Sequence, residues 1–181
     1  VMDKNKILYH LQKAFFFANN GRKGPVWIDI PLDVQGDTVE TSGLKEYTPD
    51  DEEIGKAYEI NDNEIESVYE ALNNSNRPAI LVGYGVMASG GTEYIRELSE
   101  YLQIPVLTTW RAKGIFDEQE ELFFGSPGVP ATRYSNYVLQ NSDFLLIIGT
   151  RLNPLITAYN ERNFAPKAKK IIVDIDKYEI D

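Results

Sequence analysis

Three apolar runs decide the fold of this chain: Ala79-Ile80-Leu81-Val82, Phe144-Leu145-Leu146-Ile147-Ile148 and Lys170-Ile171-Ile172-Val173. Each run passes directly into a loop of glycine, hydroxyl or charged residues, namely Gly83-Tyr84-Gly85, Gly149-Thr150-Arg151 and Asp174-Ile175-Asp176. Continuous apolar runs of this length, without alternation, are typical of parallel strands that crossover helices bury on both faces. The sequence therefore predicts an α/β fold built on a doubly wound parallel sheet.

Segments with helical spacing lie between these runs. The expected additional elements are a helix capped by Asp62, helices over 91–102 and 131–140, a strand over 104–109 and a last strand over 170–175. Strands that alternate with helices imply right-handed parallel crossovers. We therefore predict a compact Rossmann-like unit, with helices on both faces of the sheet, over residues 62–181.

The first 61 residues differ from this unit. Apolar residues at helical spacing predict a helix over 6–20, and Pro25-Val26-Trp27-Ile28-Asp29-Ile30-Pro31 is typical of a strand. One helix and one strand cannot close a core, so residues 1–35 are expected to need a sheet that the chain does not contain. Residues 36–61, with the charge run Asp50-Asp51-Glu52-Glu53, are predicted to be an acidic surface linker.

The composition disfavours several classes of function. The 181 residues carry a formal net charge of −10, which argues against binding to nucleic acid or to an anionic membrane. There is no cysteine, and His10 has no second imidazole with which to hold a metal, so no metal ligand is predicted. No apolar run approaches the roughly 20 residues of a membrane span. A cytoplasmic protein is the default expectation.

The candidate site is the edge of the sheet at which the strands end. Ligands of doubly wound sheets bind outside the carboxyl ends of the strands, where the strand order reverses. The residues expected at this edge, as candidate cofactor-binding residues, are Gly83, Tyr84, Gly85, Thr108, Gly149, Thr150, Arg151, Asp174, Ile175 and Asp176.

The glycine loop has two interpretations. Residues 83–88 match the pattern G-x-G-x-x-A, in which glycines let backbone amides approach a pyrophosphate. A site for NAD would also need an acidic residue after the second strand, but Arg111 and Lys113 stand there and the first acid is Asp117. NAD binding is therefore disfavoured, and glycines that serve only a tight turn remain an open alternative.

Other side chains also keep alternatives. Arg151 can pair with a phosphate through two parallel hydrogen bonds or form a salt bridge with a carboxylate. Asp174 and Asp176 can bind a ribose or an adenine, or can cap the end of the last strand. Trp27 and Trp110 are expected to be buried against neighbouring elements.

Four stretches of sequence, taken in order, carry a resemblance to a known family. They are Gly24-Pro25-Val26-Trp27-Ile28-Asp29-Ile30-Pro31-Leu32-Asp33-Val34-Gln35, Arg77-Pro78-Ala79-Ile80-Leu81-Val82-Gly83-Tyr84-Gly85, and the segments 141–152 and 164–176. The first resembles the segment that closes the pyrimidine-binding domain of thiamine diphosphate-dependent enzymes of the acetolactate synthase type. The others resemble the first strand and the last third of the central domain of these enzymes.

The resemblance implies a parent enzyme that uses thiamine diphosphate and Mg²⁺ to make or break a carbon–carbon bond in a 2-oxo acid, as a lyase or transferase. The family's activating glutamate and its Gly-Asp-Gly metal motif match no stretch of this chain, so no catalytic residue is predicted. The family assembles as homodimers or homotetramers, and its central domain holds FAD or another nucleotide such as ADP in some members. Two departures weaken the case for FAD here: Leu152-Asn153-Pro154 replaces an aspartate-rich segment, and Pro127 stands where a histidine is frequent.

The resemblance leaves two alternatives. The chain is expected to be the non-catalytic central domain of such an enzyme, in contact with the other domains of its own polypeptide. The alternatives are a stand-alone nucleotide-binding regulatory module without thiamine chemistry, and a purely structural domain.

Overall fold

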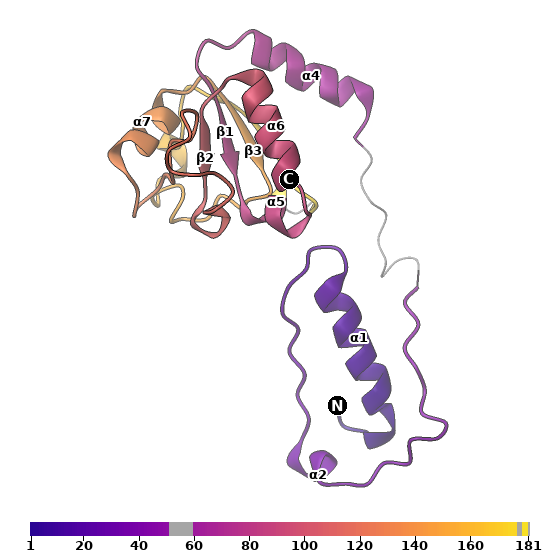
Figure 1. Ribbon diagram of the computed structural model, residues 1–181. Coiled ribbons are helices and arrows are strands. Elements are labelled where there is room, and N and C mark those ends of the chain that lie inside the picture. The colour runs from indigo at the N-terminus through magenta and orange to yellow at the C-terminus, as the bar shows by residue number, and fades with distance from the viewer. Residues whose placement is uncertain (51–59, 177–178, 181) are drawn as a thin grey trace. The chain divides into compact units, whose positions relative to one another are not determined.

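The chain divides into two compact units, Val1–Tyr58 and Glu59–Asp181. The computed structural model describes residues 1–50, 60–176 and 179–180. Figure 1 shows a helix with extended chain in the N-terminal unit, and a sheet flanked by helices in the C-terminal unit.

The C-terminal unit is built on a parallel sheet of strands β1 (Pro78–Val82), β2 (Val106–Thr108), β3 (Phe144–Ile148) and β4 (Lys169–Val173). Their order is β2-β1-β3-β4, and every pairing is parallel. The predicted α/β fold is confirmed, although β2 is shorter than the expected strand and β4 begins and ends earlier. The order reverses between β1 and β3, because the chain adds β2 on one side of β1 and later adds β3 on the other.

Each strand alternates its side chains between two apolar cores, which explains the continuous apolar runs. Ile80 and Leu146 face α4 (Asp62–Asn73) and α6 (Thr92–Leu102). Leu81 and Ile147 face the opposite side, which α7 (Arg133–Asn141) covers. These strand residues are at most 8% exposed, and burial of each side chain stabilises the unit by about 1.5–3 kcal/mol. Helices on both faces are as predicted.

The helix ends show where local prediction was imprecise. Asp62 does not cap α4: the N-cap is Asn61, whose side chain accepts a hydrogen bond from the Glu64 N–H at 3.1 Å, while the Glu64 carboxylate accepts one from the Asn61 N–H at 3.0 Å. This reciprocal pair satisfies two backbone donors at once, which explains why the helix begins one residue earlier. The short helix α5 (Tyr84–Ala88), directly after β1, was not predicted.

Single turns of 3₁₀ helix complete the described elements. They are η1 (Lys4–Lys6), η2 (Trp110–Ala112) and η3 (Glu161–Asn163). None of the described helices has the length and apolar character needed to cross a bilayer.

The N-terminal unit contains α1 (Ile7–Asn19) and the single turn α2 (Leu32–Gln35). The strand predicted over 25–31 is wrong: this segment pairs with no other described strand, because a lone extended segment has no partner for its backbone groups. Trp27 is 86% exposed rather than buried, for the same lack of a covering layer. No residue of 1–50 is buried.

Part of the predicted linker packs on α1. The ring of Tyr47 meets the ring of Tyr9 edge to face at 5.4 Å, and the Tyr47 N–H donates to the Gln12 side chain at 2.8 Å. Of the predicted charge run over 50–53, residues 51–53 lie outside the described residues.

Asp143 joins the turns that lead into three strands. Its carboxylate accepts the backbone N–H groups of Asn76 at 3.0 Å and Arg77 at 2.8 Å, just before β1, and its carbonyl accepts the N–H of Lys169 at the start of β4. Partial burial pushes the pKa of Asp143 upward, but the N–H groups of Arg77 and Asn76 and the Arg77 charge outweigh it and hold the pKa below its ordinary value of 3.8.

We expect Asp143→Asn to lower the free energy of unfolding by about 1 kcal/mol at pH 7. This is less than the ~1.5–3 kcal/mol of a charged hydrogen bond, because the carboxylate is partly exposed and Asn keeps one acceptor oxygen. The carboxylate contribution is complete above the ordinary pKa and is lost as the pH falls through the lower pKa of the folded protein. Urea unfolding should therefore show the gap between variant and parent closing at acid pH.

The matched control is Glu97→Gln, which changes an exposed carboxylate of α6 with no hydrogen bond or ion pair to the described residues. A gap of equal size in both variants, or one that widens as the pH falls, would contradict the role of Asp143.

Candidate functional site

The sheet brings the ends of its four strands to one edge. In the strand register Val82 lies beside Thr108 and Ile148, and Ile148 lies beside Val173. Backbone hydrogen bonds continue past these residues: the Gly83 N–H donates to the Ile148 carbonyl at 2.8 Å, and the Gly149 N–H to the Val173 carbonyl at 2.9 Å. The loops that hold the predicted site residues therefore lie along one edge.

The glycine loop after β1 packs directly on the loop after β3. The Gly85 N–H donates to the Gly149 carbonyl at 2.9 Å. A Cβ on Gly83 would lie 2.2 Å from the Thr150 Cβ, and a Cβ on Gly85 would lie 2.8 Å from the Gly149 Cα. Gly149 itself has φ +62°, a conformation that other residues rarely adopt. Backbone contact between the two loops is thus a sufficient reason for all three glycines.

This contact uses the amides that a phosphate cradle would need. The N–H groups of Gly83, Gly85 and Val86 all donate to backbone carbonyls within the chain, at 2.8–3.2 Å. The helix that follows, α5, has only five residues, so its dipole is weak. The geometry favours close packing over pyrophosphate binding as the role of the two glycines in the G-x-G pattern.

Arg151 and the end of β4 are engaged within the chain. The Arg151 Nε lies 3.7 Å from a Glu179 carboxylate oxygen, and the Arg151 side chain is 62% exposed. Such an exposed ion pair contributes little to stability and can be exchanged for a ligand. The Asp174 carboxylate accepts the Asp176 N–H at 3.0 Å, which is a capping contact at the strand end. Ile175 is 69% exposed.

Arg111 lies over the ring of Tyr84 at the same edge. The sequence predicted Tyr84 as a site residue but not Arg111. The Arg111 guanidinium carbon lies 4.4 Å from the centre of the Tyr84 ring, which joins η2 to the start of α5. Tyr84 is 43% exposed, and Trp110 is 42% exposed although burial was expected. Trp110 begins η2 beyond the buried end of β2, where the core no longer covers it. The two basic residues Arg111 and Lys113, which follow the second strand, were the feature of the sequence that could have indicated Arg111 as a site residue.

Two buried hydroxyl groups lie without a hydrogen-bond partner among the described residues, Thr108 Oγ1 and Ser126 Oγ. The Thr108 N–H donates to the Gly125 carbonyl at 3.0 Å, which brings the segment with Ser126 beside the end of β2. An unpaired buried hydroxyl costs free energy that a bound polar group would recover.

The donor set at this edge can be compared with the chemistry of FAD and ADP. Arginine suits a phosphate, and exposed aromatic rings suit a planar base. The side chains therefore fit a nucleotide, whereas the backbone loop does not offer its usual phosphate cradle. No group of three carboxylate or histidine side chains suited to a metal occurs among the residues described.

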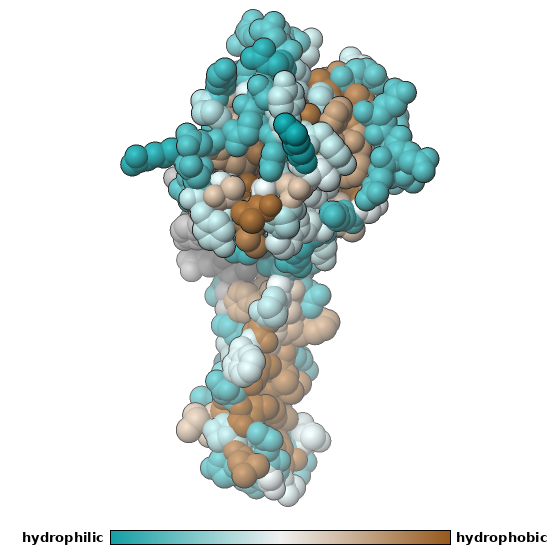
Figure 2. All heavy atoms as spheres, turned by 90° about the vertical axis from the view of Figure 1, so that its left-hand side faces the viewer, coloured by the Kyte–Doolittle hydropathy of each residue, from teal (hydrophilic) through white to brown (hydrophobic). Residues whose placement is uncertain are grey.

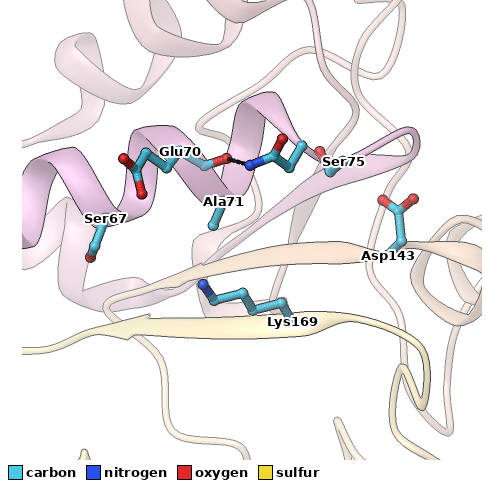
Figure 3. Close-up of a pocket in the computed structure, with 7 residues that line it drawn as sticks. Ser67, Glu70, Ala71, Ser75, Asp143 and Lys169 are labelled. Carbon is cyan, nitrogen blue, oxygen red and sulfur yellow. Dashed lines mark hydrogen bonds between the residues drawn. The ribbon is translucent and has the colours of Figure 1, made fainter.

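A hollow at the opposite end of the sheet is a weaker candidate. It has a volume of about 360 Å³ and is lined by Ser67, Glu70, Ala71, Asn74, Ser75, Asp143 and Lys169. In Figure 3 these residues come from α4, the turn after it, and the starts of β3 and β4. Its polar groups serve the fold: Asn74 donates to the Glu70 carbonyl at 2.8 Å, and Asp143 holds the turn before β1.

Comparison with known proteins agrees with this architecture. The family model described as "Thiamine pyrophosphate enzyme, central domain" matches residues 65–181. The chain is 37% identical, over 92% of its length, to a probable acetolactate synthase large subunit of Methanocaldococcus jannaschii, and 36% identical, over 99%, to the acetolactate synthase large subunit of Corynebacterium glutamicum. It is 35% identical, over 94%, to the acetolactate synthase isozyme 1 large subunit of Escherichia coli. It spans 28–29% of the length of these relatives.

We expect Gly83→Ala to lower the free energy of unfolding by about 1–3 kcal/mol, because the new Cβ would overlap Thr150 and the Gly149 backbone, which cannot move as a flexible side chain would. Gly91→Ala is the matched control. Gly91 is also a helix N-cap, and the nearest atoms to its Cβ would be the Ser89 hydroxyl oxygen at 3.3 Å and the Val86 carbonyl oxygen at 3.4 Å, so the overlap is far smaller than at Gly83. Equal stability of the two variants in urea unfolding would refute close packing of the loops.

Thr108→Val is expected to raise the free energy of unfolding by about 1 kcal/mol in the absence of ligand, because it removes a buried hydroxyl that has no described partner. Ser135→Ala is the contrasting variant, since the Ser135 hydroxyl donates to the Ser126 carbonyl at 2.8 Å and its loss should destabilise the unit. Thermal unfolding compares the two, and destabilisation by both would show that Thr108 has a partner.

Proposed function

Because the chain belongs to the thiamine pyrophosphate enzymes and contains their central domain, we propose that it is the middle part of an enzyme of the acetolactate synthase or decarboxylase type that acts on a 2-oxo acid. The observation that carries this proposal is the similarity to acetolactate synthase large subunits along nearly the whole chain. The chain spans less than a third of those relatives, so the activity is proposed for a longer polypeptide.

The N-terminal unit is proposed to be the tail of a pyrimidine-binding domain, over residues 1–35. None of residues 1–50 is buried, and the large apolar side chains of Phe15 and Trp27 are 74% and 86% exposed. Figure 2 shows apolar side chains gathered along this unit. A hollow of about 280 Å³ lies between α1 and the extended segment that contains Trp27 and Ile28. Apolar surface of this kind is stable when further sheet and helix cover it.

The C-terminal unit is proposed to act as a rigid spacer that binds a nucleotide, FAD or ADP, and does no catalysis. Strands β1, β2 and β3 of its sheet are packed in cores on both faces, and such close packing makes the unit stiff. When bound, thiamine diphosphate with Mg²⁺ supplies the carbanion chemistry, and we assign both to domains other than this one. The residues of this chain are proposed to hold those domains at their distance and to fix the nucleotide at the strand-end edge.

Assembly and location are proposed from the same family membership. The parent enzyme is expected to be a homodimer or homotetramer in the cytoplasm. Exposed Tyr94 and Tyr101 on α6, 77% and 86% exposed, supply surface for such contacts.

The proposal predicts that the polypeptide that contains this chain consumes pyruvate or another 2-oxo acid only when thiamine diphosphate and Mg²⁺ are both added. The measurement is 2-oxo acid consumption and CO₂ release by the purified polypeptide, with each cofactor omitted in turn as the control. The coding sequence on either side should contain the activating glutamate and the Gly-Asp-Gly motif. Absence of both motifs, with no cofactor-dependent turnover, would favour the stand-alone nucleotide-binding module.

A further inference from the structure

We propose that Arg111, held over the ring of Tyr84, is the residue that binds the phosphate of a nucleotide at the strand-end edge, in place of the glycine loop. This inference rests on the proposed nucleotide site of the C-terminal unit, and it names the group that recognises the ligand. The shared chemistry is the diphosphate of ADP or of FAD.

The amides of the G-x-G pattern do not supply phosphate contacts. The N–H groups of Gly83, Gly85 and Val86 donate hydrogen bonds to backbone carbonyls. The Gly149 Cα and carbonyl fill the space next to the Gly85 Cα. Since these three amides are engaged, we look to the side-chain cations of the edge for a contact with a phosphate.

Arg151 and Arg111 at this edge differ in their partners within the chain. Arg151 lies 3.7 Å from Glu179, so a phosphate there would compete with a carboxylate of the chain. Arg111 forms no hydrogen bond or ion pair with any residue that the structure describes, and its side chain is exposed. Its guanidinium donors are therefore available for a bidentate contact with a phosphate.

Arg111 is already in position. Its guanidinium carbon is 4.4 Å from the Tyr84 ring centre, a distance at which a cation is attracted to the face of the ring. This contact limits the rotamers of a long side chain before the ligand arrives, which lowers the entropy lost on binding. No described residue accepts a hydrogen bond from the guanidinium, so this contact leaves its N–H donors available.

The neighbours of Arg111 suit the rest of a nucleotide. Trp110 and Met87 are 42% and 39% exposed and can cover a planar ring. Lys113 is also exposed and adds positive charge on the same segment.

The experiment is calorimetric titration of the 181-residue chain with ADP, FAD, adenosine and inorganic pyrophosphate. We expect ADP to bind at least tenfold more tightly than adenosine. Arg111→Ala should weaken ADP at least tenfold, and Arg151→Ala less than threefold. The FAD arm shows whether the flavin adds affinity, and the pyrophosphate arm shows whether the phosphates alone suffice.

Variants of Tyr84 test the positioning. Tyr84→Phe keeps the ring under the guanidinium and should bind ADP within twofold of the parent chain, whereas Tyr84→Leu removes the ring and should weaken ADP severalfold. Circular dichroism of each variant confirms that it is folded, and a Tyr84→Leu chain that binds ADP normally would overturn the role of the ring.

The assignment of phosphate binding to Arg111 is overturned if adenosine binds as tightly as ADP, if Arg151→Ala causes the main loss, or if neither ADP nor FAD binds. These results are separable from the proposed function. If the longer polypeptide turns over a 2-oxo acid with its cofactors but no nucleotide binds, only the role of Arg111 is contradicted. If a nucleotide binds but there is no such turnover, only the proposed enzymatic activity is contradicted.

Discussion

The pairing of β1 with β3 is the constraint on which the rest of the C-terminal unit depends. Both strands are almost completely buried, and their register runs from Pro78 beside Phe144 to Val82 beside Ile148. The strand order reverses at this pair, so both apolar cores and both glycine loops are built around it. Asp143 anchors the entry to the pair by accepting backbone N–H groups from the turn before β1.

The close approach of the two loops at the other end of this pair has a consequence for ligand recognition. Glycine at 83, 85 and 149 lets backbone meet backbone, which stiffens the edge but uses the amides. In the proposed nucleotide site, recognition falls to side chains that project beyond the loops, and Arg111, whose guanidinium carbon lies 4.4 Å from the Tyr84 ring centre, is the one we assign to the phosphate. The same G-x-G pattern can thus be a packing device in one sheet and a phosphate cradle in another.

The two units differ in how they gain stability. The C-terminal unit buries apolar side chains of β1, β2 and β3 in a core on each side of its sheet. The described part of the N-terminal unit buries no residue, and ring contacts such as that of Tyr9 with Tyr47 hold its segments together. Contacts of this kind contribute about 0.5–1.5 kcal/mol each, which is small beside the burial of a core. Its stability is therefore expected to depend on further chain or on a partner that covers α1.

The sequence by itself determined the class of the fold, because continuous apolar runs such as Phe144–Ile148 can be satisfied only by burial on both faces. It also determined that the strand ends would meet at one edge, since parallel strands share their direction. Only the tertiary structure decided what happens there. Gly85 contacts Gly149, and Arg111 lies over the ring of Tyr84. Each contact joins residues that are far apart in the chain, so no local sequence pattern could predict it. For the same reason residues 25–31 carry the pattern of a strand without forming one: a strand exists only through hydrogen bonds to a partner, and local sequence does not supply the partner.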